Sequence, residues 1–138
     1  MYTSDIENNN KRAQKCALVY LIVSIFCAFF GGVYEVFGHG VYSFHMIYAF
    51  GFPLALGALP FVIISRSKLK VYPVYASLSC YHLAIATATV GCILQGALDI
   101  YGTTSVLMII YPYVSVALFS ASIVIYLIQI FKNKKSRP

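Results

Sequence analysis

Four long apolar stretches, at residues 16–37, 41–64, 71–98 and 105–131, make up most of this 138-residue chain. Each is at least as long as the roughly 20 apolar residues that an α-helix needs to cross a bilayer. Only 10% of the residues are charged, whereas a typical soluble domain has about 25%. Because so few charges cannot cover a water-facing surface, the sequence predicts an all-α membrane protein with four transmembrane helices.

The polar residues lie outside the apolar stretches and predict the domain boundaries. Residues 1–15 are a polar and then basic head, residues 65–70 a basic loop, and residues 132–138 a basic tail. Between them lie a first transmembrane hairpin, 16–64, and a second, 71–131. The first stretch exceeds the 7–15 apolar residues of a signal peptide, so we interpret it as a retained anchor. The opening residues, MYTSDIENNN, are typical of a disordered segment.

The basic residues predict the orientation of the chain. All ten lie in the head, the middle loop and the tail, as Lys11, Arg12, Lys15, Arg66, Lys68, Lys70, Lys132, Lys134, Lys135 and Arg137. Cytoplasmic loops carry the excess of Lys and Arg, so both termini and the middle loop are expected in the cytoplasm. The net charge of +6 then reflects orientation and indicates no nucleic-acid partner.

Two segments of the sequence resemble each other, namely GGVYEVFGHG at 31–40 and QGALDIYGTT at 95–104. An offset of 64 positions aligns Glu35 with Asp99 and the glycines 32 and 38 with glycines 96 and 102. The sequence therefore predicts two tandem hairpins of common origin. Because both hairpins start on the same side, they would be a parallel repeat, related by a pseudo-twofold axis along the membrane normal.

Small residues predict where the helices pack, because helices in lipid associate by close fit. Two stripes have a spacing of four residues, one in the first helix (Ser24, Ala28, Gly32) and one in the third (Ala84, Ala88, Cys92, Gly96). We expect Gly32 and Gly96 to lie at helix crossings. Pro53, Pro60 and Pro112 are expected to kink the second and fourth helices.

Glu35 and Asp99 are the only acidic residues outside the head, and the outer loops contain no base to neutralise them. Carboxylates near hydrocarbon usually have a partner. One interpretation is an outward-facing site for a cation or small polar ligand, formed by Glu35, His39, His45, Asp99 and Gln95. Such side chains suit Zn²⁺ or another divalent ion, although the pattern names no cofactor. The alternative is that each acid braces the turn beneath it.

Two further polar positions lie deeper in the third helix. His82 is expected near mid-membrane, where a lone histidine more often bonds a neighbouring helix than binds a cofactor. His39 and His45 lie at a different depth, which disfavours haem ligation by a histidine pair. Thr87, Gly91, Gln95 and Asp99 form a stripe along one face of the helix, which is either an inward path for a ligand or a tight helix contact.

The segments YEVFGHGVYSFHMIYAFGFPLALGALPF and ATATVGCILQGALDIYGTTS resemble a group of small four-span bacterial membrane proteins. The resemblance covers most of the chain and implies a four-span fold in a bacterial cell membrane, without implying an activity. Small multidrug exporters keep an acid inside the first helix, which this chain lacks, and the charge bias opposes the dual topology of fluoride channels.

Three functional classes follow from these patterns. The first is a transporter- or channel-like binding protein, and the second is a structural or accessory subunit that packs against a larger membrane partner. Partners are expected to be the lipid bilayer and either a second copy, in a homodimer, or a larger membrane complex. A membrane enzyme ranks last because no nucleophile–base set is recognisable. The four cysteines contain no C-x-x-C pair, so they predict neither a disulfide framework nor a thiolate metal site.

Overall fold

The computed structural model describes residues 2–38, 42–66 and 73–135, which form helices and no strand. The first hairpin contains α1 (Tyr2–Phe37), α2 (Phe44–Tyr48), the π-helix η1 (Pro53–Ala58) and α3 (Leu59–Arg66). The second contains α4 (Tyr75–Tyr101), the 3₁₀-helix η2 (Val106–Ile109) and α5 (Ile110–Lys135).

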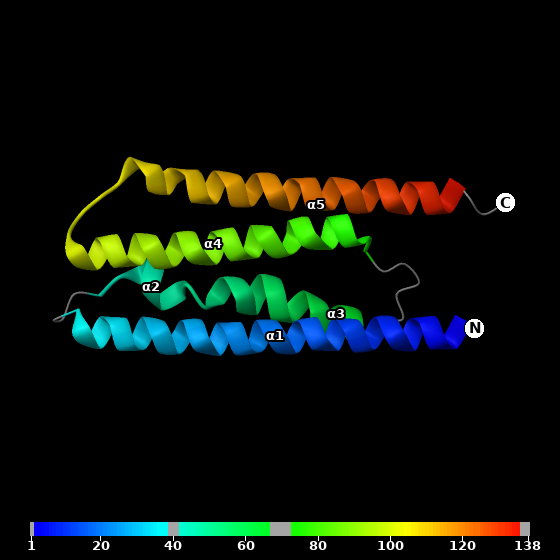
Figure 1. The fold of residues 1–138 in the computed structure, drawn as a ribbon, viewed down its shortest axis with the longest axis horizontal. Coiled ribbons are helices and arrows are strands. Elements are labelled where there is room, and N and C mark those ends of the chain that lie inside the picture. The colour runs from blue at the N-terminus through cyan, green and yellow to red at the C-terminus, as the bar shows by residue number, and fades with distance from the viewer. Residues whose placement is uncertain (1, 39–41, 67–72, 136–138) are drawn as a thin grey trace.

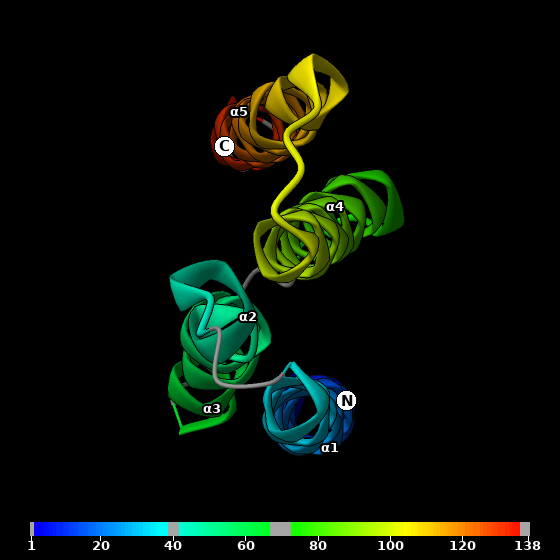
Figure 2. The same ribbon diagram turned by 90° about the vertical axis from the view of Figure 1, so that its left-hand side faces the viewer.

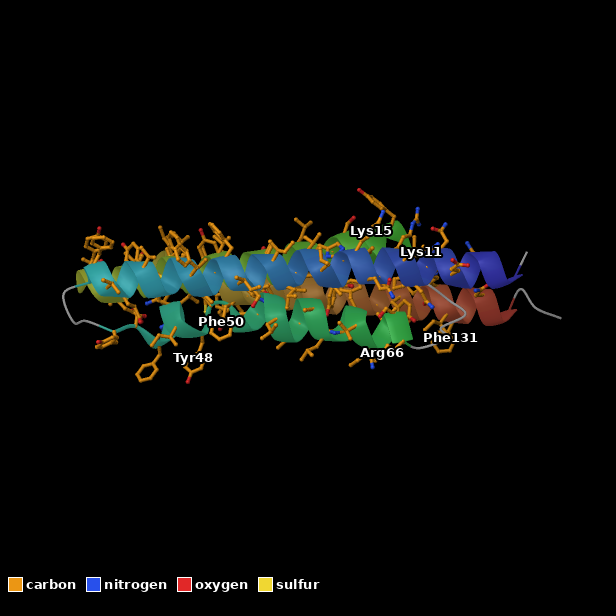
Figure 3. The ribbon with its side chains drawn as sticks, turned by 90° about the horizontal axis from the view of Figure 1, so that it is seen from below. Lys11, Lys15, Tyr48, Phe50, Arg66 and Phe131 are labelled. Atoms are coloured by element: carbon orange, nitrogen blue, oxygen red, sulfur yellow. The ribbon has the colours of Figure 1, made fainter. Side chains whose placement is uncertain are left out.

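Four helical segments are long and apolar enough to cross a membrane, namely Glu7–Phe37, Phe44–Arg66, Tyr75–Tyr101 and Val106–Asn133. Their number and order agree with the four predicted stretches. Both ends of the chain lie at one end of the molecule, together with the end of α3 and the start of α4 (Figure 1). We call this the basic end, because it holds Lys11, Lys15 and Arg66 (Figure 3). The opposite end, where α1 and α4 finish, is the distal end.

The four spans lie side by side in a staggered row that follows the order of the chain (Figure 2). α1 packs on η1 and α3, α2 and η1 pack on α4, and α4 packs on α5. A twofold axis that exchanges the hairpins would bring α5 against α1, just as α2 lies against α4. Figure 2 shows α1 and α5 at opposite ends of the row. The origin of the hairpins as a repeat stays a prediction.

The polar head is helical, so the prediction of a disordered opening segment is wrong. α1 begins at Tyr2 and continues without interruption into the apolar stretch. Within the head, Glu7 and Lys11 form an ion pair of 2.8 Å at a spacing of four residues, which supports a helix. Further along, Ala13 and Ala17 are buried against Phe61 of α3. The head therefore continues α1, which the contact with α3 stabilises.

The second span is interrupted near Pro53, as its prolines predict. Pro53 has no N–H to donate, so the helical hydrogen-bond ladder is broken there and η1 follows. Neighbouring helices bond the carbonyls of this region. Ser24 of α1 donates to the Phe50 carbonyl at 3.1 Å, and Tyr81 of α4 donates to that of Leu56. Pro60 and Pro112 lie in the first turns of α3 and α5, where proline is tolerated.

The buried stripe of α1 differs from the predicted one. Ser24 is buried, but Ala28 and Gly32 are exposed, and the buried residues that follow Ser24 are Cys27 and Gly31. The reason is geometric, because each step of four residues rotates around a helix by about 40° beyond a full turn. Alternating steps of three and four stay on one face, and this alternation places Gly31 against Met46.

The small residues of α4 contact neighbours on two sides, as a helix inside the row requires. A Cβ at Gly96 would lie 2.8 Å from the backbone nitrogen of Met46, and one at Gly91 would lie 2.6 Å from the Cβ of Tyr111. Ala84 is buried, whereas Ala88 and Cys92 are partly buried. The predicted stripe of α4 therefore lies among contacts to both α2 and α5.

Serine hydroxyls join α4 to α5. The hydroxyls of Ser77 and Ser122 each donate to the backbone carbonyl of the other residue at 2.9 Å. Ser115 donates to the carbonyl of Ala84, also at 2.9 Å. Such bonds let two apolar helices associate in a fixed register.

Candidate functional site at the distal end

Asp99 lies in the last turn of α4, and the end of that helix fixes its position. Gly102 adopts a left-handed conformation with φ of 68°. Its N–H donates to the carbonyl of Asp99 at 3.1 Å, and that of Thr103 donates to the carbonyl of Leu98 at 3.0 Å. This glycine-terminated end closes the backbone of the turn and leaves the carboxylate free to bond elsewhere.

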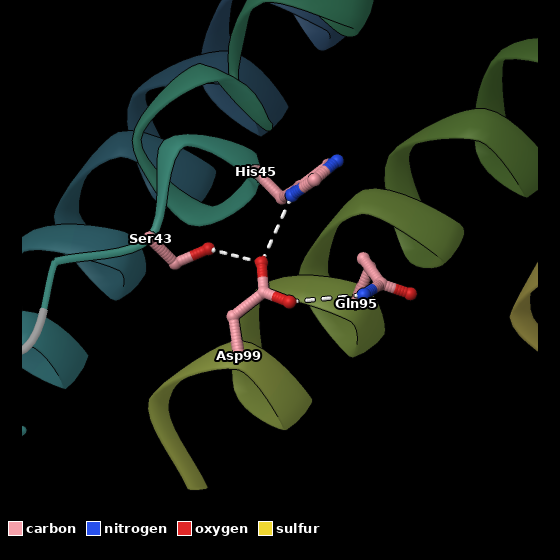
Figure 4. Close-up of polar contacts among 4 residues, drawn as sticks. All are labelled: Ser43, His45, Gln95 and Asp99. Carbon is pink, nitrogen blue, oxygen red and sulfur yellow. Dashed lines mark hydrogen bonds and ion pairs between the residues drawn. The ribbon is translucent and has the colours of Figure 1, made fainter. Parts of the chain in front are cut away.

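Three side chains bond the Asp99 carboxylate (Figure 4). Oδ2 accepts from the Ser43 hydroxyl and from Nδ1 of His45, both at 2.9 Å. Oδ1 accepts from Nε2 of Gln95, one turn earlier on α4, also at 2.9 Å. Ser43 and His45 belong to the first hairpin, so Asp99 joins the two hairpins. None of these three side-chain bonds joins the Asp99 carboxylate to the turn that follows α4. This differs from the predicted turn brace.

The Asp99 cluster, consisting of Ser43, His45, Gln95 and Asp99, is partly open to its surroundings. The side chain of His45 is 55% exposed and that of Asp99 is 31% exposed, whereas Ser43 is only 2% exposed. Among the described side chains, His45 is the one basic group within bonding distance of this carboxylate. The cluster therefore keeps a net negative charge whenever His45 is neutral.

A pocket of about 560 Å³ adjoins the cluster between α2, α4 and α5. Its polar lining residues include His45, Gln95 and Ser105. Its walls are mainly apolar and include Phe52, Met108, Ile109 and Tyr111. The small residues Ala88, Gly91 and Cys92 of α4 leave room for it. The volume is in the range of small-molecule sites, where a few polar groups orient a ligand within an apolar cavity.

Glu35 lies apart from this hydrogen-bond network, although both acids occur at the distal end. It is not among the side chains that bond Asp99. Its Oε1 atom is buried and has no hydrogen-bond partner among the described residues. Gly31, one turn earlier, faces Met46, so Glu35 lies on the face of α1 that approaches the start of α2. An unpaired buried carboxylate oxygen is costly, which sets Glu35 apart from the well-bonded Asp99.

The predicted metal set is not assembled among the described residues. No group of three His, Cys, Asp or Glu side chains in residues 2–38, 42–66 and 73–135 is arranged to hold a metal ion. The remaining candidate, His39, lies outside the described residues. Glu35, His45 and Asp99 come from different elements whose side chains do not converge on one point.

The deeper polar residues bond locally. His82 is hydrogen-bonded to Tyr20 of α1 and stacks on Phe61, with ring centroids 5.7 Å apart. The Thr87 hydroxyl donates to the carbonyl of Leu83 in its own helix at 2.8 Å. Gly91 packs on Tyr111. Within the predicted polar stripe, therefore, Gln95 and Asp99 are hydrogen-bonded to each other. Thr87 bonds its own helix and is not part of that network.

Two residues of these networks were not predicted from the sequence. Ser43 directly precedes α2 and makes no capping bond to it, so its hydroxyl bonds Asp99 instead. Its position before a helix was a visible signal, since serine is favoured there. Tyr20 carried no such signal, because a tyrosine within an apolar stretch has no distinctive spacing.

Comparisons of the chain with models of known protein families, with curated proteins and with solved structures gave no match.

Proposed function

We propose that this protein is an integral membrane protein with four spans and cytoplasmic termini. Four segments have the required length and hydropathy. Large apolar side chains such as Phe29 and Ile128 are exposed on the outer helices, which fits contact with lipid. The positive-inside rule places the basic end in the cytoplasm and the distal end outside.

We further propose that the two hairpins are tandem repeats. The offset of 64 residues, which aligns Glu35 with Asp99 and Gly38 with Gly102, supports this origin. The order of elements also supports it, because each hairpin has one long helix, α1 or α4, followed by a span that begins irregularly, at α2 or η2.

The function that the geometry supports best is an outward-facing binding site for a cation or a small cationic polar ligand, centred on Asp99. The observation that carries this proposal is the partly exposed Asp99 carboxylate, which three side chains hold in place. Two of them, His45 and Gln95, also line the adjoining pocket of about 560 Å³. Donors that hold a carboxylate favour its charged form, and charged groups within membrane proteins are typical of ligand and ion sites. A transporter- or channel-like role would use the pocket as the inward path.

A second candidate is an accessory subunit of a larger membrane complex. It is favoured by the bonds from Ser43 and His45 to Asp99, because these connect the two hairpins. In that case Asp99 stabilises the fold, and the outer helices supply the surface for a partner.

Ligand-dependent thermal unfolding of the purified protein in detergent distinguishes these candidates. Na⁺, K⁺, Mg²⁺ and tetramethylammonium serve as probes, because a ligand of the folded state raises the unfolding temperature with its concentration. We expect at least one probe to stabilise the wild type and the Glu35→Gln variant, and to lose its effect on Asp99→Asn. Glu35→Gln is the matched control, since it removes the other distal carboxylate.

The other outcomes have equally definite meanings. If both variants lose the effect, the site is shared between the two acids. If no probe stabilises the wild type and Asp99→Asn simply unfolds at a lower temperature, the subunit role is supported and the binding site is wrong.

A further inference from the structure

A second cavity, which does not include the Asp99 cluster, lies between α1 and α4 along the middle of the two helices. It is a groove of about 620 Å³, with Val19, Val23 and Phe26 of α1 on one side and Ala86, Val90 and Ile93 of α4 on the other. Pro53 of η1 also lines it, and Lys15 lies at one end. We infer that this groove binds one acyl chain of an anionic phospholipid from the cytoplasmic leaflet, with the headgroup held by Lys15.

The length of the groove matches one leaflet. On α1 its lining extends from Lys15 to Cys27, which is about 18 Å at the rise of an α-helix. Half of a bilayer's hydrocarbon core is about 15 Å deep. The groove that begins beside Lys15 is therefore at least as long as the hydrocarbon depth of one leaflet.

The chemistry of the lining suits hydrocarbon. Three polar side chains of the lining bond within the protein, since Tyr20 is bonded to His82 and the Thr89 hydroxyl donates to the carbonyl of Ile85 at 2.8 Å. A polar occupant would find few free partners there, whereas an acyl chain needs none.

The charge at the end of the groove selects the headgroup. Lys11 pairs with Glu7, but Lys15 makes no ion pair among the described side chains. A second copy of this chain in the same orientation would bring its own basic end against Lys15. That arrangement repels like charges, whereas an anionic phosphate complements the lysine.

The inference rests on the proposed membrane location but not on the Asp99 site, and native mass spectrometry in mild detergent tests it separately. The protein is incubated with equal amounts of phosphatidylglycerol and phosphatidylcholine of the same acyl chains. We expect the wild type to retain one phosphatidylglycerol in preference. Lys15→Gln should lower this retention about fivefold, the factor for one basic residue at an anionic surface.

Arg66→Gln is the matched charge control, because Arg66 lies at the same end but on the opposite side of the molecule (Figure 3). It should retain the lipid as the wild type does. Ala86→Phe fills the groove and should abolish retention, whereas Ala28→Phe adds the same volume at an exposed position outside the groove and should not. Since Lys15 is exposed, its replacement tests the site even if Ala86→Phe fails to fold.

Three results would overturn the inference. The first is equal retention of both lipids by the wild type. The second is an equal loss of phosphatidylglycerol retention in Lys15→Gln and Arg66→Gln. The third is a lipid-free dimer that dissociates in Ala86→Phe. The first two indicate unspecific lipid contact, and the third indicates that a second copy occupies the groove.

Discussion

Gly31 of α1 and Gly96 of α4 both face Met46, so two different spans approach the backbone of the same residue. A Cβ at Gly31 would lie 3.0 Å from the Met46 carbonyl oxygen, and one at Gly96 would lie 2.8 Å from the Met46 nitrogen. Met46 itself is only 1% exposed. This three-helix contact holds α2 in position, and α2 in turn supplies His45 to Asp99.

Enlarging Gly96 should destabilise the protein. Gly96→Leu inserts a side chain where backbone atoms of Met46 leave no space, so we expect a loss of about 1–3 kcal/mol or more in the free energy of unfolding. Chemical or thermal unfolding in detergent measures it. Gly32→Leu is the control, because a Cβ there has no neighbour within 4 Å. Equal losses in the two variants would contradict the close contact at Met46.

Removing the hydroxyl groups that bond the interrupted second span should also lower stability. Ser24→Ala and Tyr81→Phe each leave a carbonyl near η1 without its side-chain donor, at a cost of about 0.6–2 kcal/mol. Ser120→Ala is matched to the first variant, because the hydroxyl of the exposed Ser120 bonds the Val116 carbonyl in its own helix. A control as unstable as Ser24→Ala would mean that the bonds between helices contribute nothing specific.

The orientation is testable with reporter fusions. A reporter active in the cytoplasm should be active after Lys68 and Lys134, and one active outside should be active after Gly40 and Thr103. The reason is that all ten basic residues lie in the head, the middle loop or the tail. A cytoplasmic signal at Gly40 would reverse the proposed orientation and with it the outward-facing site.

The sequence predicts the spans well because length and hydropathy are properties of whole segments. The four stretches correspond to four long apolar helices, and Pro53 marks the interruption of the second. The head was mispredicted, because the contact of Ala13 and Ala17 with Phe61 depends on a residue about fifty positions away.

The site was predicted only in part, for a related reason. Asp99, Gln95 and His45 do lie together, but Glu35 does not bond with them and Ser43 does. Which acid joins a network depends on the rotation of each helix within the row. If the buried position is misassigned by one residue, such as Gly32 in place of Gly31, the predicted buried face is rotated by about 100° around the helix axis.

The arrangement of the spans in a row has a consequence for how the protein is made. Each span packs mainly on the one synthesised before it, so a nascent chain can dock every new helix against one that is already inserted. Contacts between neighbours in the chain also form quickly, because little loop entropy is lost in closing them. Biogenesis can thus proceed from the N-terminus onward without waiting for α5. Because α5 is synthesised last and packs mainly on α4, it is the helix that can detach with the least disturbance to the others.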